Sequence, residues 1–283
     1  LFGIENISGS SFDDVLTGDA NANVLSGNDG NDTLSGLGGN DNLRGRDGDD
    51  ILDGGAGADI LEGGDGIDTV TYANSTAGVT IGLGLNDSLG AKGTGGDAAG
   101  DQLEQVENLI GSKFNDKLTG NEQDNVISGG KGNDILTGGD GKDTFVYNAG
   151  DGLDTITDFE NGADIIDISS MDGVEFGDLD IQQSGANTVI TFDATNKITL
   201  LNFDKNDLDA GDFKFANAAP TDISLDNDTI DENNAPDTLI GTLSATDPDD
   251  NTGFTFTLID DADGRFEIKG NELYAKQTLD AEK

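Results

Sequence analysis

Aliphatic residues recur at every ninth position between Gly9 and Thr71, with glycine and polar residues between them. Cut at each leading glycine, this stretch gives seven consecutive nonapeptides: GSSFDDVLT, GDANANVLS, GNDGNDTLS, GLGGNDNLR, GRDGDDILD, GGAGADILE and GGDGIDTVT. The eighth residue is always Leu or Val, and the sixth is Asp in every unit except the second, which has Asn23. Positions seven to nine predict a very short strand with an inward eighth side chain, and the glycines at positions one, two and four predict a turn. Two units would then form one coil of a solenoid.

The same pattern returns later in the chain. Residues 1–36 and 103–138 are identical at 19 of 36 positions, a duplication with a constant offset of 102 residues. The second copy continues as GSKFNDKLT, GNEQDNVIS, GGKGNDILT and GGDGKDTFV, followed by the imperfect unit AGDGLDTIT at 149–157 and a remnant, NGADIID, at 161–167. The two blocks differ in length by whole nonapeptides, which a stacking solenoid tolerates because each unit contacts only its neighbours.

The remaining segments alternate apolar and polar residues with the period of a strand. Val79, Ile81, Leu83 and Leu85 do so between the blocks, before a glycine-rich loop at 90–100. Alternation over 179–203, with a turn candidate at 184–187, predicts a small antiparallel cap, and four strands predicted at 222–225, 238–245, 254–259 and 265–269 suggest a β-sandwich.

The predicted fold is therefore all-β, with two parallel β-roll blocks, a β-rich insert and cap, and a partial β-sandwich. The predicted segments are 1–71 (first roll block), 72–110 (insert), 111–166 (second roll block), 167–216 (antiparallel cap) and 217–283 (partial sandwich). Each block opens with a phenylalanine, Phe12 or Phe114, and ends in a tyrosine, Tyr72 or Tyr147. We interpret these aromatic residues as end caps of an open solenoid, with local packing as the alternative.

Composition brings in a second alternative for the repeat blocks. A formal charge of -43 and 43 glycines are typical of a disordered acidic linker. However, the glycines are in phase with the apolar position, and the acids are mainly Asp at fixed sites, which indicates structure. So acidic a chain would repel nucleic acid and anionic membrane surfaces, and no stretch reaches the roughly 18 apolar residues of a membrane span.

The chain contains neither cysteine nor histidine. Disulfides, the Ser-His-Asp triad and HExxH zinc sites are thereby excluded, although a pair of carboxylates could still act in acid-base catalysis. Carboxylate and carbonyl oxygens are the ligands that Ca²⁺ prefers, and stacking would align the sixth-position aspartates of successive coils with the carbonyls of the glycine turns. Calcium between adjacent turns would relieve the repulsion within each row, so that binding becomes folding free energy.

The units GGAGADILE, GGDGIDTVT, GGKGNDILT and GGDGKDTFV resemble the GGxGxDxUx consensus of the RTX family, the hemolysin-type calcium-binding repeat proteins. This resemblance implies a parallel β-roll with Ca²⁺ between neighbouring turns on each side. It also implies disorder at low cytosolic calcium and folding after type I secretion from a Gram-negative bacterium.

By position in the consensus, the resemblance gives the carboxylate ligands Asp14, Asp32, Asp41, Asp50, Asp59, Asp68, Asp116, Asp134, Asp143 and Asp154. It gives turn carbonyl donors at Gly27, Gly30, Gly36, Gly45, Gly48, Gly54, Gly57, Gly63, Gly66, Gly129, Gly132, Gly138 and Gly141. Asn23 and Asn125 replace the aspartate in the second unit of each block, so we expect weak or absent sites there.

Residues 217–283 resemble a bacterial cadherin-like repeat in the sequences NAAPTDISL, DEN, ATDPDD, DGRFEI and LDAEK. That resemblance implies calcium ligands at Glu232, Asp247, Asp249 and Glu282, with ordinary surface acids as the alternative. The chain starts at Leu1 without an initiator methionine or a signal peptide, so we expect it to be a piece of a longer protein.

The leading hypothesis is a calcium-dependent, non-catalytic structural or extender segment of a large secreted or surface-anchored bacterial exoprotein, similar to an adhesin. The alternatives are the secretion and folding tail of an extracellular protease, lipase or alginate epimerase, and a surface-layer or matrix protein. Calcium ions are the only partner expected of this segment. Cell-surface or polysaccharide partners, if the parent protein has them, would be bound by its other parts.

Overall fold

The structure, a computed structural model, describes residues 5–84, 90, 92–216, 222–231, 233–246 and 254–279. The chain divides into two compact units, Leu1–Ala216 and Asn217–Lys283. The described elements are β-strands apart from three 3-10 helices, η1 (Gly96–Ala98), η2 (Phe176–Asp178) and η3 (Ala210–Asp212). The prediction of an all-β protein is thus confirmed. No helix among these residues is long and apolar enough to cross a bilayer.

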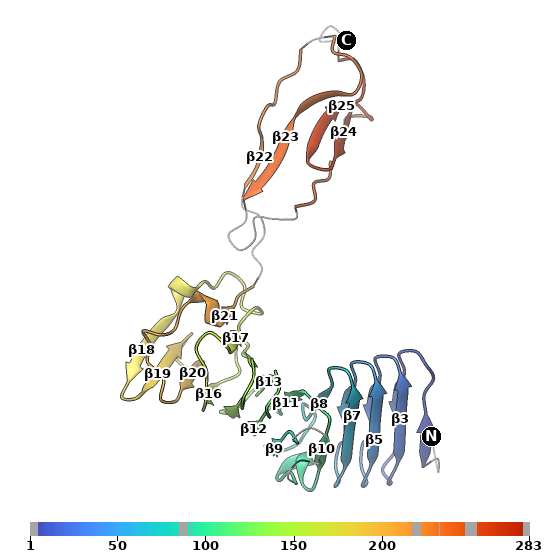
Figure 1. Ribbon diagram of the computed structural model, residues 1–283, viewed down its shortest axis with the longest axis vertical. Helices are drawn as coiled ribbons and strands as arrows, with labels where there is room; N and C mark the ends of the chain where they lie inside the picture. The colour runs from blue at the N-terminus through green and yellow to red at the C-terminus, as the bar shows by residue number, and fades with distance from the viewer. Residues whose placement is uncertain are drawn as a thin grey trace. The chain divides into compact units, whose positions relative to one another are not determined.

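The first unit is a parallel β-roll built from three sheets (Figure 1). The sheet that we call the long sheet contains β2 (Val15–Thr17), β4 (Thr33–Ser35), β6 (Ile51–Asp53), β8 (Thr69–Thr71), β11 (Asn108–Ile110), β13 (Val126–Ser128), β15 (Thr144–Val146), β17 (Ile165–Asp167) and β21 (Phe213–Lys214). The first short sheet contains β1 (Asn6–Ser8), β3 (Val24–Asp29), β5 (Asn42–Asp47), β7 (Ile60–Asp65) and β10 (Gln102–Glu104). The second short sheet contains β9 (Thr80–Gly82), β12 (Lys117–Thr119), β14 (Ile135–Thr137), β16 (Leu153–Ile156), β20 (Lys197–Leu200), β19 (Asn187–Thr191) and β18 (Asp180–Ser184).

The long sheet joins the two repeat blocks into one roll. Leu109 of β11 pairs with Val70 of the first block on one side and with Ile127 of the second block on the other. The segment between the blocks supplies a strand to each short sheet, since β10 pairs with β7 while β9 pairs with β12. The roll therefore changes its short sheet at this junction and keeps its long sheet throughout.

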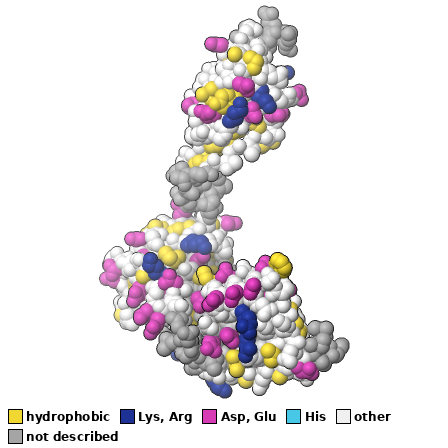
Figure 2. Space-filling model, turned by 45° about the vertical axis from the view of Figure 1, so that its right-hand side comes forward, with side chains coloured by type: hydrophobic (Ala, Val, Ile, Leu, Met, Phe, Trp, Pro, Cys, Tyr) yellow, Lys and Arg dark blue, Asp and Glu magenta, His cyan; other side chains and the backbone are white. Residues whose placement is uncertain are grey.

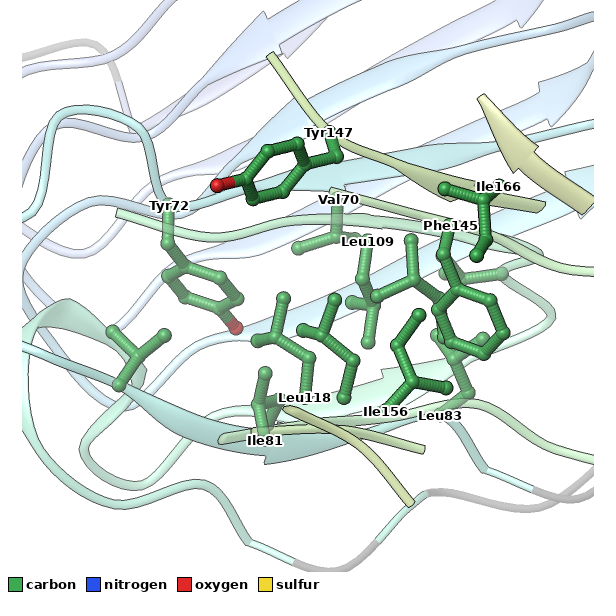
Figure 3. Close-up of a cluster of buried hydrophobic side chains, with 14 of the residues drawn as sticks. Val70, Tyr72, Ile81, Leu83, Leu109, Leu118, Phe145, Tyr147, Ile156 and Ile166 are labelled. Carbon is green, nitrogen blue, oxygen red and sulfur yellow. The ribbon is translucent and has the colours of Figure 1, made fainter. Parts of the chain in front are cut away.

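The core of the roll is the stack of eighth-position side chains. Parallel pairing in register places Leu34 between Leu16 and Leu52, and the same alignment repeats in the short sheets. Leu25, Leu34, Leu43, Leu52, Leu61 and Val70 are all 0% exposed. Leu16 of the first described coil is only partly buried, because a single coil covers it. Figure 3 shows the continuation of this core through Leu109, Leu118, Phe145, Ile156 and Ile166.

The aromatic residues are not caps at the ends of two separate rolls. Phe12 is 76% exposed and Phe114 is 39% exposed, so neither covers the core. Tyr72 is buried at the junction, where the roll continues past it (Figure 3). Tyr147 is also buried and stacks on Phe192, with 5.0 Å between the ring centroids. For Tyr72 and Tyr147 local packing is therefore the correct interpretation, because the continuous long sheet leaves no free end at Tyr72.

The segment after the second block first extends the roll. β20 pairs in parallel with β16, and β21 pairs in parallel with β17. β18 and β19 then form a hairpin on the outer edge of β20.

The second unit is one antiparallel sheet in the order β22 (Asp222–Leu225), β23 (Thr238–Thr246), β25 (Glu272–Ala275) and β24 (Phe266–Lys269). The strand predicted at 254–259 is wrong: these residues alternate apolar and polar side chains but pair with no described strand, and Ile259 is fully exposed. The sequence analysis also missed β25. A second sheet, which a sandwich requires, is not found among the described residues of this unit.

The stacked core generates a first prediction. Leu52→Ala should lower the free energy of unfolding in saturating calcium by about 2–5 kcal/mol, because it leaves a cavity among fully buried neighbours. Ile51→Ala is the matched control: the adjacent side chain points outward and is 45% exposed, so we expect a loss below about 1 kcal/mol. Urea unfolding followed by far-UV circular dichroism measures both, and equal losses would contradict the inward and outward assignment.

Candidate metal sites in the turns of the roll

The sixth-position side chains lie in three rows, one for each sheet into which their turns lead. The long-sheet row runs Asp14, Asp32, Asp50, Asp68, Glu107, Asn125, Asp143, Asp164. The first short-sheet row is Asn23, Asp41, Asp59, Asp101, and the second is Asp116, Asp134, Asp154. Most of these side chains are buried; for example Asp50 is 1% exposed and Asp68 0%.

One carboxylate oxygen of each interior aspartate is held by the backbone of the neighbouring coil. The Asp32 N–H donates to Asp50 Oδ1 at 2.7 Å, and the Asp50 N–H donates to Asp68 Oδ1 at 2.9 Å. The short-sheet rows repeat the arrangement, as from Asp41 N–H to Asp59 Oδ1 at 2.7 Å and from Asp116 N–H to Asp134 Oδ1 at 2.8 Å. Because the bond needs only an oxygen acceptor, this ladder fixes each side chain without neutralising it.

The other carboxylate oxygen has no hydrogen-bond partner in many of these residues. Among the described residues, this holds for the buried Oδ2 atoms of Asp32, Asp41, Asp50, Asp59, Asp68, Asp134 and Asp143. A buried charge without a partner is costly, and native structures rarely leave one. We call these atoms the orphaned oxygens.

Each orphaned oxygen points at the first glycine of its own turn. A Cβ on Gly36 would collide with Asp41 Oδ2 and would lie 2.6 Å from the carbonyl oxygen of Gly54 in the next coil. The same convergence is found at Gly45. A Cβ on this residue would collide with Asp50 Oδ2 and would lie 2.8 Å from the carbonyl oxygen of Gly63. A carboxylate oxygen and a carbonyl oxygen thus face one small space, which any side chain at position one would fill.

The backbone conformation of position two is related to which carboxylates are orphaned. In every turn with an orphaned oxygen, position two has a positive φ, including the non-glycine residues Asn28 (86°), Leu37 (71°) and Arg46 (94°). Ser10, Asp19, Ser112 and Asn121 hold the same position without a positive φ. There the position-two N–H donates to the sixth side chain: from Ser10 to Asp14 at 2.6 Å, and from Asn121 to Asn125 Oδ1 at 2.8 Å. A left-handed residue at position two is therefore associated with a carboxylate oxygen left open.

The first two turns of each block are closed in this way. Asp14 accepts from the Ser10 N–H and Oγ–H, which lower the pKa of its carboxyl. Asp116 Oδ2 accepts from the Ser112 N–H and, at 3.0 Å, from its Oγ–H. Asn23 Oδ1 accepts from the Asp19 N–H at 2.7 Å. The weak sites predicted at Asn23 and Asn125 remain a prediction, and the structure gives Asp14 and Asp116 the same kind of competing donor.

Sequence reasoning missed three members of the rows. Asp101 accepts from the Asp59 N–H at 2.8 Å, Glu107 accepts from the Asp68 N–H at 2.9 Å, and Asp164 accepts from the Asp143 N–H at 3.0 Å. A signal for Asp101 was present, because GDQLE at 100–104 repeats the xDxLE of ADILE at 58–62. The carboxylate of Asp164 belongs to the remnant NGADIID.

Nine of the thirteen proposed carbonyl donors fall into two sets, to which Gly45, Gly57, Gly66 and Gly141 do not belong. The first-position oxygens of Gly27, Gly36, Gly54, Gly63, Gly129 and Gly138 lie over the first glycine of the preceding coil in their row. The carbonyl oxygens of Gly30, Gly48 and Gly132, which are fourth-position residues, face the fourth-position backbone of the following coil. Glu232, Asp247, Asp249 and Glu282 lie outside the described residues. The assignment of all these groups as calcium ligands stays a prediction.

Burial raises the pKa of the sixth-position aspartates. It raises the pKa of Asp50 and Asp59 to about 6, that of Asp68, Asp134 and Asp143 to about 7, and that of Asp154 to about 8. Burial is the largest cause, neighbouring carboxylates add to it, and the ladder hydrogen bonds oppose it. The pKa values of these buried carboxyls are thus raised toward neutral pH, and a bound cation would compete with protons for them.

The donor set fits a hard divalent cation. Within the described ranges, no three acidic side chains gather into a metal-binding cluster, so carbonyl oxygens would have to complete the shell. Carboxylate and carbonyl oxygens together are what Ca²⁺ takes, typically six to eight of them.

Comparisons with known proteins agree with this geometry. A family model of the RTX calcium-binding nonapeptide repeat matches residues 2–34, 35–70, 110–145 and 119–156. The predicted recognition of RTX repeats is confirmed, and these repeats are calcium-binding structural elements. The resemblance of residues 217–283 to a cadherin-like repeat stays a prediction.

No curated protein sequence matches the chain significantly. Among solved structures, the chain is similar to the crystal structure of the extracellular lipase LipA from Serratia marcescens, with 20% identity and a TM-score of 0.33. The similar region covers 69% of this chain and 40% of the lipase, so the chain spans well under two thirds of that protein.

A charge-matched pair of variants tests the assignment of the rows. Asp50→Asn should raise the calcium concentration at half-maximal folding by roughly tenfold or more, because ligand charge sets calcium affinity. Asp49→Asn removes the same charge one residue earlier, where the side chain only accepts the Ile67 N–H at 2.9 Å, a role that an amide oxygen can fill. It should shift the midpoint little. A calcium titration followed by circular dichroism measures both, and similar shifts would contradict a specific role for the sixth position.

The raised pKa values predict how the calcium-free chain responds to pH. An unfolded aspartate titrates near about 3.9, so between roughly pH 4 and 8 the folded roll binds more protons than the unfolded chain. Stability without calcium should accordingly rise as the pH falls through about 8 to 6 and be lost as the pH rises again. Far-UV circular dichroism of the chain in EGTA between pH 5 and 8 measures this as the fraction of the chain that is folded. A folded fraction that increases with pH would contradict the prediction.

Proposed function

We propose, from the premise that the chain contains RTX calcium-binding nonapeptide repeats, that it is a non-catalytic structural segment that folds on binding calcium. Its role would be to form a stiff extender within a secreted or surface-anchored bacterial exoprotein of the adhesin type. Calcium ions would be held by the sixth-position aspartates and the first-position glycine carbonyls of successive coils.

The observation that carries this proposal is the set of orphaned oxygens. Each belongs to a side chain that is at most 3% exposed, and each faces a carbonyl-lined turn or the backbone of its own first glycine. Basic residues are too few to neutralise the acidic ones, since the chain has 57 acidic and 14 basic residues. The described ion pairs of the roll, Arg44 with Glu62 and Lys214 with Asp167, involve no carboxylate with an orphaned oxygen.

Ion binding would decide between the folded and unfolded states. Free calcium at about 100 times its dissociation constant stabilises the folded state by roughly 2.7 kcal/mol per site. Several such sites exceed the net stability of many small domains, which is about 5–15 kcal/mol. The roll would therefore stay unfolded where calcium is scarce and fold where it is abundant.

This calcium dependence supports export before folding. A chain that remains unfolded at the low calcium level of a cytoplasm could pass a type I secretion channel, and outside the cell calcium would close the coils. The absence of cysteine is compatible with this order, because calcium rather than disulfides would hold the folded state.

A non-catalytic role is supported by the arrangement of the acids. Paired carboxylates in catalysis stand alone in a cleft, whereas here they repeat from coil to coil with the same ladder bond. Figure 2 shows further acidic side chains on the outer surface of the roll, with few basic side chains between them.

Removing calcium tests the proposed function directly. In EGTA at pH 7.5, the far-UV spectrum should change from β-rich to disordered, and added calcium should restore it. Magnesium at the same concentration should be a poor substitute, because it dehydrates reluctantly and demands near-octahedral geometry. A chain that keeps its β-spectrum and protease resistance in EGTA would refute a calcium-driven fold.

A further inference from the structure

The orphaned oxygens fall into two groups along the roll. The first group lies on turns that end at Asp32, Asp41, Asp50, Asp59 and Asp68, and the second on those that end at Asp134 and Asp143. Between Asp68 and Asp134, the described residues include further members of the rows, but none carries an orphaned oxygen. This interval contains the junction at which the roll changes its short sheet.

A tyrosine hydroxyl ends the first short-sheet row. Tyr72 is 2% exposed, and its hydroxyl donates to Asp101 Oδ2 at 3.1 Å. Asp101 Oδ1 accepts the last ladder bond, from Asp59, while the Asp101 N–H turns back to the carbonyl oxygen of Ala98 at 3.2 Å. Both carboxylate oxygens of Asp101 thus have protein donors, and the ladder goes no further.

An asparagine interrupts the long-sheet row one coil further on. Asn125 is neutral and 1% exposed, and its Nδ2–H donates to the carbonyl oxygen of Glu107 at 2.8 Å. Its Oδ1 accepts the Asn121 N–H, as in the other closed turns. The ladder bond from the Asp68 N–H to Glu107 is therefore followed by the Asn125 side-chain amide contact and not by another ladder bond. A new ladder starts with the bond from the Asn125 N–H to Asp143.

The second short-sheet row begins with its charge already paired. Asp116 Oδ1 accepts the Val79 N–H at 2.7 Å, and Oδ2 accepts both donors of Ser112. Asp101, Asn125 and Asp116 thus have their polar side-chain atoms paired with hydroxyl, amide and backbone groups. We call the two adjacent coils that contain these three residues the joint.

We propose that this joint needs no ion and divides the calcium sites into two groups that fill independently of each other. The inference rests on the proposed calcium-dependent folding. Within a group, an ion that orders one turn also fixes the carboxylate that accepts the ladder hydrogen bond from the neighbouring coil. Binding at one site therefore favours binding at the next. Across the joint the side-chain ladders are broken.

Independent filling is not the obvious outcome for this fold. The long sheet is continuous through β8, β11 and β13, and backbone pairing could couple the blocks. Coupling between linked sites typically changes affinity by about 5–150-fold. The two possibilities therefore differ by a measurable amount.

The experiment uses the full chain and disables one group at a time. Asp50→Asn with Asp59→Asn disables the first group, and Asp134→Asn with Asp143→Asn disables the second. Hydrogen exchange with mass spectrometry follows peptides from both blocks during a calcium titration. In each double variant we expect the calcium midpoint of the disabled block to rise by about tenfold or more, and that of the other block to change by less than about twofold.

The outcomes separate this inference from the proposed function. If both midpoints rise together in either double variant, calcium binding stands but independent filling is overturned. If neither block of the unmodified chain gains protection with calcium, the proposed function itself fails.

Tyr72→Phe tests the joint. Without the hydroxyl, Asp101 Oδ2 becomes a buried oxygen without a donor, so peptides covering 96–110 should need more calcium for protection, and adding Asp101→Asn should reverse the change. Tyr147→Phe is the control, because the Tyr147 hydroxyl donates to the neutral carbonyl oxygen of Gly152 at 2.7 Å. An unchanged midpoint in Tyr72→Phe, or an equal shift in Tyr147→Phe, would overturn the assigned role of Tyr72.

Discussion

The roll depends on one interaction, the backbone N–H that holds one oxygen of a buried carboxylate while the other oxygen stays open. From Asp32 to Asp50 to Asp68, this bond fixes the position of each side chain but leaves its charge in place. The thin aliphatic core cannot offset many buried charges, since one fully buried Leu or Val contributes only about 1.5–3 kcal/mol. The same contact therefore aligns the candidate ligands and leaves a buried charge that a cation would neutralise.

The nine-residue period of the sequence was enough to predict most of the fold and much of the candidate site. It placed the core leucines, the short strands and the sixth-position rows, because a stacked coil must return to the same register every eighteen residues. It could not place the junction, where β9 and β10 enter different sheets, because the run of nonapeptides is interrupted after Thr71. The predicted strand at 254–259 was wrong for a related reason. Alternating apolar and polar residues are compatible with a strand, but a strand forms only where a partner strand pairs with it.

The identity of the sixth residue was an incomplete guide to the sites. Asp14 and Asp50 occupy the same consensus position, yet the first accepts two donors from Ser10 and the second has an open oxygen. The difference follows the φ of position two, which glycine would signal in the sequence. Here Leu37 and Arg46 adopt the left-handed conformation without being glycine, so stacking against the neighbouring coil overrides local preference. Residue type alone could not reveal this, because φ is fixed by tertiary contacts.

A row of like charges also needs a defined end, and the structure provides one with neutral donors. Asp164 Oδ2 accepts the Glu160 N–H at 2.8 Å, as Asp101 accepts the Tyr72 hydroxyl and Asp14 accepts Ser10. Such ends limit how far repulsion accumulates along the roll in the absence of metal, since interactions between like charges add over each uninterrupted row. A long calcium roll built from short rows can therefore fold in parts. The duplication of the blocks, with a hydrogen-bonded joint between them, is a way to lengthen the roll without lengthening any one row of unpaired charge.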